Sequence, residues 1–462
     1  MPAWLAELAY LAAAVCFIYG LKWLSSPATA VRGNRLSAVG MLVAIAVTLV
    51  DRAIVTYGVI IAGLLVGSGL GLWLAQTVKM TAMPQMVALL NGLGGGASLL
   101  VGAAEFLKSA SAGGQPRLDV AIATQAALLV GAVTLTGSLV AWAKLEERMT
   151  GRPITFPKQK TVNALVFLVI VALGVWLVAR PDPPVWPLYL VCLLSLALGV
   201  LLVIPIGGAD MPVVISLLNS YSGIAGGMTG FVIRNDELII AGALVGSSGI
   251  ILSQIMCKAM NRSLGNVLFG AFGGAGEISA RTAEGLAVRQ ISAEDAAVQL
   301  AFARTVIVVP GYGLAVAQAQ YLVRELADLI EKKGGEVKYA IHPVAGRMPG
   351  HMNVLLAEAN VPYDKLYDMD QINGEFERTD VALVIGANDV VNPAARTDPA
   401  SPIYRMPILN VDYSRSIIVM KRGMGSGFAG IENELFYNPK TSMLFGDAKA
   451  SLTKLVGELK VA

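Results

Sequence analysis

The sequence predicts a polytopic α-helical membrane domain of about nine transmembrane helices, followed by a C-terminal α/β domain with a doubly wound sheet. Three observations predict this fold class. Residues 1–260 are mostly apolar, in stretches long enough to cross a bilayer. Residues 305–462 alternate short runs rich in Val and Ile with helical stretches. Residues 261–304 form a connector, in which the glycine-rich run 270–276 precedes a charged stretch that we expect to be helical.

The composition supports a membrane protein and argues against two other classes. The chain is 55% hydrophobic and 15% charged, whereas soluble domains are about a quarter charged. A net charge of +3 is too small and too dispersed to indicate a nucleic-acid partner. Cys16, Cys192 and Cys257 all lie in apolar stretches, so we expect packing residues, with no metal site and no disulfide framework.

The apolar half divides into candidate spans, each close to the roughly 20 residues that a bilayer requires. They are residues 4–24, 36–50, 54–76, 84–107, 120–143, 161–179, 186–206, 211–233 and 237–258. The span at 211–233 is rich in Gly and Ser and would be missed by a strict hydropathy criterion. No positive charge precedes the first run, so we interpret it as a retained span and not as a cleaved signal peptide.

Basic residues between the spans predict the orientation. An odd number of spans puts the two ends of the chain on opposite sides of the membrane. The side shared with the C-terminal domain carries Lys22, Arg32, Arg35, Lys79, Lys144, Arg148, Arg152, Lys158, Lys160, Lys258 and Arg262. The other side carries Arg52, Lys108, Arg117, Arg180 and Arg234. The positive-inside rule therefore places the C-terminal domain in the cytoplasm.

Polar residues in or beside the spans are candidates for function, because each is costly there. Asn91 and Asn219 lie inside spans, Asp210 precedes span 211–233, and Ser247 and Ser248 lie in the middle of span 237–258. A buried Asn can equally be a structural hydrogen-bonding residue. No carboxylate, lysine or histidine lies near the centre of a span. A proton path would need water held by amides and hydroxyls, or a titrating group from a partner chain.

The C-terminal region shows the pattern of a doubly wound sheet. The expected strands are 305–310, 337–342, 381–386, 407–411, 416–420 and 442–445, and the expected helices are 314–333 and 447–459. Gly311 and Gly313 end the first strand and open a helix, where glycines allow a diphosphate to approach the backbone. The third glycine position of such a motif is taken by Val316. The predicted domain is therefore Rossmann-like and binds a nucleotide.

The choice of dinucleotide depends on two strand ends. The second strand ends at Ile341-His342-Pro343, with no Asp or Glu for the ribose hydroxyl of NAD. Lys421 and Arg422 follow the strand at 416–420, and cations there suit a 2′-phosphate. The sequence favours NADP(H), although a solvated strand end explains this basic pair equally well. The loops 344–350 and 386–392 also follow strands and fit a nucleotide site, with Asp389 as an acid next to a polyanion.

Together these segments resemble the β subunit of the proton-translocating NAD(P) transhydrogenases, over nearly the whole chain. The most specific stretches are residues 207–223, 242–262, 311–320, 342–351, 386–393 and 444–449. The resemblance implies hydride transfer between NADH and NADP⁺ coupled to proton translocation. It also implies a multi-pass protein of the cell inner membrane, in contact with lipid. NAD(H) would be bound by partner α subunits that add further membrane helices, in a dimer of protomers.

The resemblance also implies site residues. Besides Gly311, Gly313 and Val316, the NADP(H) contacts would be Tyr312, Val344, Ala345, Gly346, Arg347, Met348, Pro349, Gly386, Ala387, Asn388, Asp389, Val390, Arg405, Met406, Lys421, Arg422, Gly423, Met424, Gly425, Ser426, Gly427, Phe428, Asp447 and Ala448. Asp210, Asn219 and Arg262 would lie in the proton-coupling region. Many members carry a histidine where this chain has Asn91, and an amide cannot titrate in its place.

The chemistry expected of this site needs no catalytic acid or base, because the cofactor performs the redox step. Two other interpretations remain open. One is an ion transporter or channel regulated by a nucleotide-sensing domain, although no selectivity element is apparent. The other is a membrane-anchored NADP-dependent dehydrogenase, for which the region that follows the spans is short.

Overall fold

The computed structural model describes residues 3–51, 57–112, 117–151, 153–180, 184–269, 288–348, 350–399, 401, 403–425 and 431–462. The glycine-rich run 270–276 of the predicted connector lies outside these residues. The described chain divides into two compact units, one of residues 1–208 with 214–253 and one of residues 209–213 with 254–462. The domain limits at residues 260 and 304 stay predictions.

Long apolar helices make up the first unit. They are α1 (Ala3–Leu24), α2 (Pro27–Asp51), α3 (Tyr57–Thr77), α4 (Met83–Ala112), α5 (Leu118–Leu145), α6 (Gln159–Ala179), α7 (Trp186–Val203), α8 (Met211–Ile233) and α9 (Asp236–Ala259). Among the described residues, eight helices are long and apolar enough to cross a membrane. The remaining long helix, α8, has 23 residues, but its polar and glycine-rich middle lowers its hydropathy. The helical membrane domain predicted from the sequence is confirmed.

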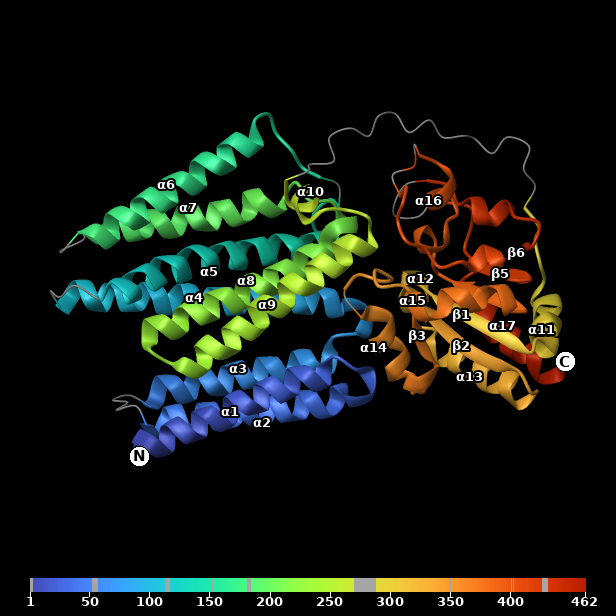
Figure 1. Ribbon diagram of the computed structural model, residues 1–462, viewed down its shortest axis with the longest axis horizontal. Coiled ribbons are helices and arrows are strands. Elements are labelled where there is room, and N and C mark those ends of the chain that lie inside the picture. The colour runs from blue at the N-terminus through green and yellow to red at the C-terminus, as the bar shows by residue number, and fades with distance from the viewer. Residues whose placement is uncertain are drawn as a thin grey trace. The chain divides into compact units, whose positions relative to one another are not determined.

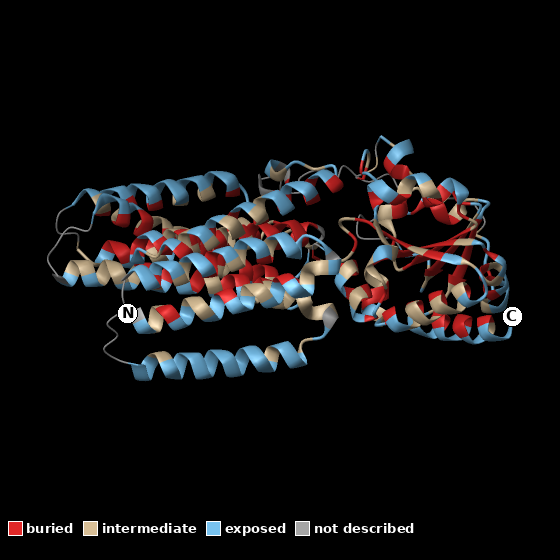
Figure 2. Ribbon diagram, turned by 60° about the horizontal axis from the view of Figure 1, so that its bottom comes forward, coloured by how far each residue is buried: buried red, intermediate tan, exposed pale blue. Residues whose placement is uncertain are grey.

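The helices of this unit pack through small residues. α4 packs on α5, α5 on α7, and α6 on α7. A Cβ at Gly131 of α5 would lie 2.6 Å from the carbonyl oxygen of Gly95 in α4. A Cβ at Gly242 of α9 would lie 2.3 Å from the backbone nitrogen of Gly227 in α8. Close backbone approach of this kind holds helices together where lipid removes the hydrophobic drive. In Figure 2 these helices are red where they face one another and pale blue on their outer faces.

One buried lysine donates hydrogen bonds to the backbone just after α7. Lys144, in the last turn of α5, is 4% exposed, and its Nζ donates to the carbonyl oxygens of Ile204 (2.5 Å) and Ile206 (2.7 Å). These carbonyls follow the end of α7, where a helix leaves acceptors without intrahelical partners. The charge therefore satisfies backbone acceptors just before the turn that leads to η2 (Gly208–Asp210).

The second unit contains a six-stranded sheet. Its strands are β1 (Thr305–Pro310), β2 (Glu336–Ile341), β3 (Leu366–Asp368), β4 (Val381–Ile385), β5 (Ser416–Lys421) and β6 (Thr441–Phe445). They lie in the order β3-β2-β1-β4-β5-β6, and every neighbouring pair is parallel. This is the strand order of dinucleotide-binding folds. The Rossmann-like fold class is thereby confirmed.

Both faces of the sheet are covered (Figure 1). On one face α13 (Gln320–Lys332) packs on β2, and α17 (Ala448–Val461) packs on β5 and against both α13 and α11 (Ala293–Phe302). On the other face a core joins inward residues of β1, β4 and β5 to Ile372, Phe376 and Leu435. Burial on both faces explains why the strands are continuously apolar and do not alternate.

The remaining short elements connect these layers. The α-helices are α10 (Leu264–Phe269), α12 (Tyr312–Ala317), α14 (His351–Glu358), α15 (Met369–Ile372) and α16 (Ala394–Thr397). The 3₁₀ turns include η1 (Met80–Ala82), η3 (Tyr363–Lys365), η4 (Asn373–Arg378), η5 (Asp389–Val391), η6 (Val411–Tyr413) and η7 (Glu434–Tyr437). Residues 288–291, in the predicted connector, run beside β6, and Gln290 forms a parallel bridge with Met443.

Two local predictions were wrong. The expected helix at 314–333 is broken into α12 and α13, because Gln318 adopts a left-handed conformation with φ 50°. The expected strand at 407–411 is a loop that ends in η6, and the short strand β3 was missed. The other five expected strands were correct to within one residue at each end.

Candidate functional site

The ends of β1 and β4 meet where the strand order reverses. The Gly311 N–H donates to the Ile385 carbonyl (2.9 Å), and the Gly313 N–H donates to the Gly386 carbonyl (3.1 Å). A Cβ at Gly311 would lie 2.3 Å from the Gly386 oxygen, and Gly386 itself has φ 69°. Glycine is therefore required directly after both strands, at positions 311 and 386. In open α/β sheets ligands bind in the crevice at this switch point, at the carboxyl ends of the strands.

Two loops predicted to bind the same ligand contact each other here. The Arg347 guanidinium carbon, in the loop after β2, lies 4.3 Å from the centroid of the Tyr312 ring at the start of α12. The ring centroids of Tyr312 and His351 are 6.1 Å apart. Val316 is half-exposed on α12. The turns after β1 and β2 thus bring an aromatic ring and a guanidinium to one end of the sheet.

Two glycines with positive φ set the conformation of the loop after β2. Gly346 has φ 106°, and a Cβ there would lie 2.6 Å from the His351 ring. Gly350 has φ 68° and precedes α14. The side chains of Ala345 and Met348 are buried, while Val344 packs on a small apolar cluster. Pro349 lies outside the described residues.

Both histidines of the chain are buried beside this loop. The His342 Nδ1 accepts from the Val344 N–H, and its Nε2 lies 2.8 Å from the Pro407 carbonyl, which requires a proton on Nε2. The His351 Nδ1 accepts from the Arg347 N–H (3.0 Å), and its Nε2 has no partner among the described residues. Burial lowers the pKa of His342 to about 4, and burial together with the Arg347 charge lowers the pKa of His351 to about 4. Both rings are neutral at pH 7.

A hydrogen bond from the Asn433 side chain holds the loop after β4 in place. Its Nδ2 donates to the Asn388 carbonyl (2.9 Å), and the Asn388 side chain donates to Asp389 Oδ1 (3.3 Å). Ala387 is buried, and the carbonyl oxygen of Val390 accepts from the Leu409 N–H. No sequence pattern indicated Asn433, because it lies more than forty residues beyond this loop.

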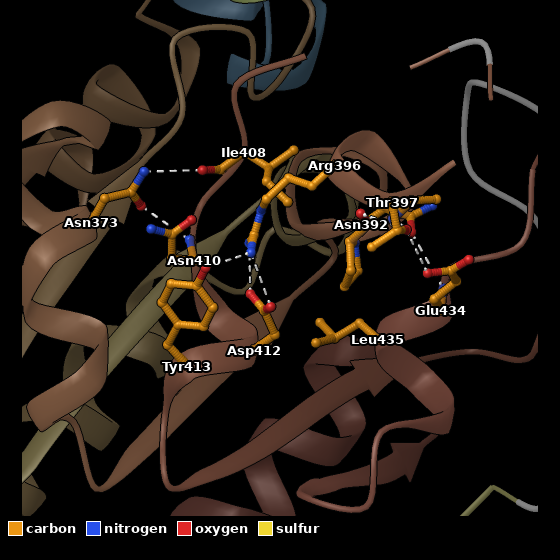
Figure 3. Close-up of polar contacts among 12 residues, drawn as sticks. Asn373, Asn392, Arg396, Thr397, Ile408, Asn410, Asp412, Tyr413, Glu434 and Leu435 are labelled. Carbon is orange, nitrogen blue, oxygen red and sulfur yellow. Dashed lines mark hydrogen bonds and ion pairs between the residues drawn. The ribbon is translucent and has the colours of Figure 1, made fainter. Parts of the chain in front are cut away.

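A second asparagine explains why residues 407–411 do not form a strand. The Asn373 Nδ2 donates to the Ile408 carbonyl, and its Oδ1 accepts from the Asn410 N–H, both at 3.0 Å (Figure 3). One amide side chain thus supplies the two backbone contacts that a neighbouring strand would make. In the same view Arg396 pairs with Asp412 at 2.8 Å.

The segment before this loop carries two further predicted residues. Arg405 has φ 63°, its N–H donates to the Ala395 carbonyl (2.7 Å), and its guanidinium lies 5.5 Å from the Tyr404 ring centroid. Met406 is buried in an apolar cluster with Ala395, Ile403 and Ile408. The backbone hydrogen bond to Ala395 therefore fixes the position of Arg405.

Two basic residues stand at the end of β5. Lys421 Nζ donates to the Gly425 carbonyl and lies 4.6 Å from the Phe436 ring centroid. Burial lowers the pKa of Lys421, and the Asp389 charge opposes that effect, so this acid and this base act on each other. Arg422 is exposed. An acid beside a polyanion is less costly when a lysine neutralises it.

The residues that follow complete the end of the sheet. Gly423 is half-buried, and Met424 and Gly425 are exposed. Ser426, Gly427 and Phe428 lie outside the described residues. At the end of β6 the Asp447 Oδ1 accepts from the N–H groups of Lys449 and Ala450, so it caps α17, which begins at Ala448. The predicted Asp447 thus has a structural role in the fold.

In the first unit the predicted polar residues lie in different surroundings. Asn91 is buried in α4, and its Nδ2 donates to the Ile215 carbonyl of α8 (3.2 Å). Asn219 is half-buried on α8. On α9 Ser247 is exposed and Ser248 is half-buried, and each hydroxyl donates to a carbonyl of its own helix. Of Asn91, Asn219, Ser247 and Ser248, Asn91 is therefore the residue whose side chain donates a hydrogen bond to another helix in the described chain.

The hydroxyls that do join α8 and α9 were missed. Ser216 donates to the Gly249 carbonyl (3.1 Å), and Ser220 donates to the Gly246 carbonyl (2.5 Å). The same Gly249 carbonyl also accepts from the buried Ser253 within α9 (2.8 Å). Their spacing of four along α8 places Ser216 and Ser220 on one face, which a helical-periodicity argument could have identified.

An ion pair lies beside the first turn of α8. Arg262 Nη1 is 3.1 Å from Asp210 Oδ2, and the Asp210 side chain is 2% exposed. Lys258, Asn261 and Arg262 also line a cavity of about 400 Å³ beyond the end of α9. The prediction grouped Asp210 with Arg262, and the structure brings these two together.

Within the described residues no cluster of His, Cys, Asp or Glu could hold a metal ion. The fold and the site together define a class, which is a polytopic membrane protein with a Rossmann-like domain whose strand ends carry glycines and basic residues. The chain belongs to the NAD(P) transhydrogenase beta subunit family, which it matches over residues 6–458. It is similar to two proteins named NAD(P) transhydrogenase subunit beta, from Rhodospirillum rubrum and from a designated strain of that species. Each is 50% identical over 454 residues, which cover 97% of both chains.

Proposed function

We propose that this chain is the NADP(H)-binding, proton-translocating subunit of a membrane transhydrogenase. NAD(H) is bound by separate α subunits, and two such protomers form a dimer in the cell inner membrane, with the Rossmann-like domain in the cytoplasm. The family supports a transhydrogenase role in a complex. The observation that carries the assignment of NADP(H) to this chain is the glycine contact at the β1–β4 switch point, with Lys421 and Arg422 at the next strand end.

The site fits a dinucleotide in three respects. Gly311 and Gly386 leave no side chain between the backbone and a bound diphosphate. Arg347 lies over the Tyr312 ring beside the same loops and can donate to phosphate oxygens. No acid follows β2, while Arg422 is exposed after β5, which favours a cofactor with a 2′-phosphate. Ser426, Gly427 and Phe428 remain predicted contacts.

NADP(H), when bound, supplies the hydride-transfer chemistry itself. The residues of this chain hold the cofactor and exclude water, since hydride transfer requires two nicotinamides in contact. No side chain need act as a catalytic acid or base. One proton crossing about 100 mV supplies about 2.3 kcal/mol, enough to bias NADPH formation if coupling is strict. Coupling operates through Asn91, Asn219, Ser247, Ser248 and the Asp210–Arg262 pair.

The test of cofactor choice uses one exposed arginine and one exposed lysine. Arg422→Gln removes a charge-assisted contact to the 2′-phosphate, so the affinity for NADP⁺ should fall roughly ten- to hundredfold. Lys454→Gln removes an equally exposed charge from α17 and should leave that affinity unchanged. Binding is measured by calorimetry on the assembled complex. Equal affinity of the wild type for NAD⁺ and NADP⁺ would contradict the proposal.

Reconstitution separates the proposal from its rivals. The chain is assembled with its α partners in vesicles, and NADH-to-NADP⁺ hydride transfer is followed together with the internal pH. A transhydrogenase moves protons only while hydride is transferred. An ion channel regulated by a nucleotide conducts without transfer, and an anchored dehydrogenase transfers hydride without a change of internal pH.

A further inference from the structure

One buried carboxylate of the first unit lacks a partner. The buried charged side chains in and beside the described apolar helices are Lys144, Asp210 and Glu237. Lys144 donates to two carbonyls, and Asp210 pairs with Arg262. Glu237 is 6% exposed, and its Oε1 is buried without a hydrogen-bond partner among the described residues. A bare carboxylate in apolar surroundings is costly, so this site requires a compensating cation or proton.

Glu237 is not needed to begin its helix. It lies in the first turn of α9, where an acidic side chain commonly accepts from backbone N–H groups. Here Asn235 takes that role, because its Oδ1 accepts from the Leu238 N–H at 2.9 Å. Asp236, also in the first turn, is exposed and can interact with the helix dipole in solvent. The burial of Glu237 therefore has no explanation in the capping of α9.

The position of Glu237 along the chain is informative. It follows the hairpin at residues 234–235 that joins α8 to α9, whereas Asp210 immediately precedes α8. α8 has 23 residues and a length of about 34 Å at 1.5 Å per residue, which is enough to cross the hydrocarbon core. The helical hairpin thus carries one buried carboxylate at each end of a membrane-long helix.

Polar groups line the contact between the two helices. Ser216 and Ser220 donate across it to carbonyls of α9, and Thr229 is buried near the hairpin. At Gly223 and Gly242 the backbones of the two helices are too close for side chains. The contact surface between α8 and α9 therefore contains backbone carbonyls and, in the first half of α8, the hydroxyls of Ser216 and Ser220.

We infer that Glu237 is a proton-binding carboxyl group, which exchanges protons with the medium at the hairpin end of α8 and α9. This inference rests on the proposed function. A hydronium ion donates to the Glu237 carboxylate: one O–H bond of hydronium breaks, an O–H bond forms on the carboxylate, and water leaves. The result is a neutral carboxylic acid within the helical hairpin. Such a group supplies the titrating site that Asn91 cannot supply.

Among the described residues, the other charged groups of the α4–α5 and α8–α9 hairpins at this end are exposed or paired. Arg234 and Asp236 lie on the hairpin itself and are exposed. At the corresponding ends of α4 and α5, Glu105 pairs with Lys108, and Asp119 pairs with Arg117. These groups remain in contact with solvent, so Glu237 is the buried acid in this group.

The experiment compares Glu237→Gln with Asp236→Asn in the complete complex reconstituted in vesicles. Glu237→Gln should slow gradient-driven hydride transfer and proton uptake about tenfold, equivalent to about 1.4 kcal/mol. Glu237→Asp should restore part of the rate. Asp236→Asn, which removes the neighbouring exposed acid, should leave the rate and its pH profile unchanged. Wild-type rates in Glu237→Gln, or equal losses in Asp236→Asn, would overturn the assignment.

Infrared spectroscopy gives a readout independent of turnover. The wild-type complex should show a protonated-carboxyl band that is lost in Glu237→Gln and retained in Asp236→Asn. If Glu237→Gln does not assemble, the band is compared in Glu237→Asp: a shifted band supports the assignment, and an unchanged band overturns it. A wild type that transfers hydride without moving protons contradicts the proposed function. A wild type that moves protons, with a fully active Glu237→Gln, contradicts only the role of Glu237.

Discussion

At the scale of single residues, His342 and His351 show how burial in a loop sets a charge state. Each ring is almost completely buried, and each accepts a backbone N–H through Nδ1. The charged form of an imidazole loses its hydration in such a position, which lowers its pKa. The loop after β2 therefore presents neutral rings, and Arg347 is the cation beside Tyr312.

This burial predicts a pH dependence. In the unfolded chain each histidine takes up a proton near its ordinary pKa of 6.5, whereas in the folded chain each ring takes up a proton only near pH 4. The unfolded state binds more protons in that interval, so the free energy of unfolding should decrease as pH falls from 6.5 towards 4. The chain has only two histidines, and isotope labelling gives one NMR signal for each. Both should keep neutral-ring chemical shifts at pH 5.5, and titration of either near 6.5 would refute its burial.

At the scale of elements, the contact between β1 and β4 depends on the absence of side chains. Gly311→Ala would place a Cβ 2.3 Å from the Gly386 oxygen and 2.5 Å from Ala387 backbone atoms. Backbone on both sides cannot move away cheaply, so the two strand ends must separate. We expect a loss of a few kcal/mol of stability, as for other overpacked sites, and a loss of NADP⁺ affinity.

A second glycine provides the control. Gly457 is exposed within α17, and no atom lies within 4 Å of a Cβ built there. Gly457→Ala should therefore stabilise the fold by up to about 1 kcal/mol, because alanine favours the helix. Thermal unfolding and NADP⁺ binding of the two variants are compared in the same complex. A Gly311→Ala variant with wild-type affinity would show that the switch point is not the binding crevice.

The same scale shows what the sequence could predict. Five strands were predicted because their apolar runs reflect burial on both faces, a local property of the chain. Residues 407–411 carried the same apolar pattern, but their backbone is held by the Asn373 side chain, a contact between distant positions. The loops at strand ends were predicted as a site since parallel topology brings them together. Asn433 and Glu237 were missed because their roles depend on tertiary burial, whereas the spacing of Ser216 and Ser220 on one helical face could have identified that pair.

At the scale of the whole molecule, the proposed function requires that proton binding in the helices and NADP(H) binding on the sheet affect each other. Thermodynamic linkage makes this effect reciprocal and equal in both directions. Asn219 is a suitable residue for a test, because it is half-buried on α8, one position before the buried Ser220 that contacts α9. Asn219→Asp adds one carboxylate there without a large change of volume.

Asn219→Asp should change the affinity of the assembled complex for NADPH by roughly five- to 150-fold, the usual range of an allosteric coupling. The change should depend on pH, since the introduced carboxyl group resembles the native amide when it is protonated and differs from it in charge when it is ionised. Calorimetric titration of NADPH at several pH values measures both effects. Thr77→Ala is the control, because this exposed hydroxyl of α3 donates to a carbonyl of its own helix in the described chain. If Asn219→Asp bound NADPH with wild-type affinity at every pH and pumped protons normally, α8 would carry no coupling at this position, and the path would have to follow the buried serines that face α9.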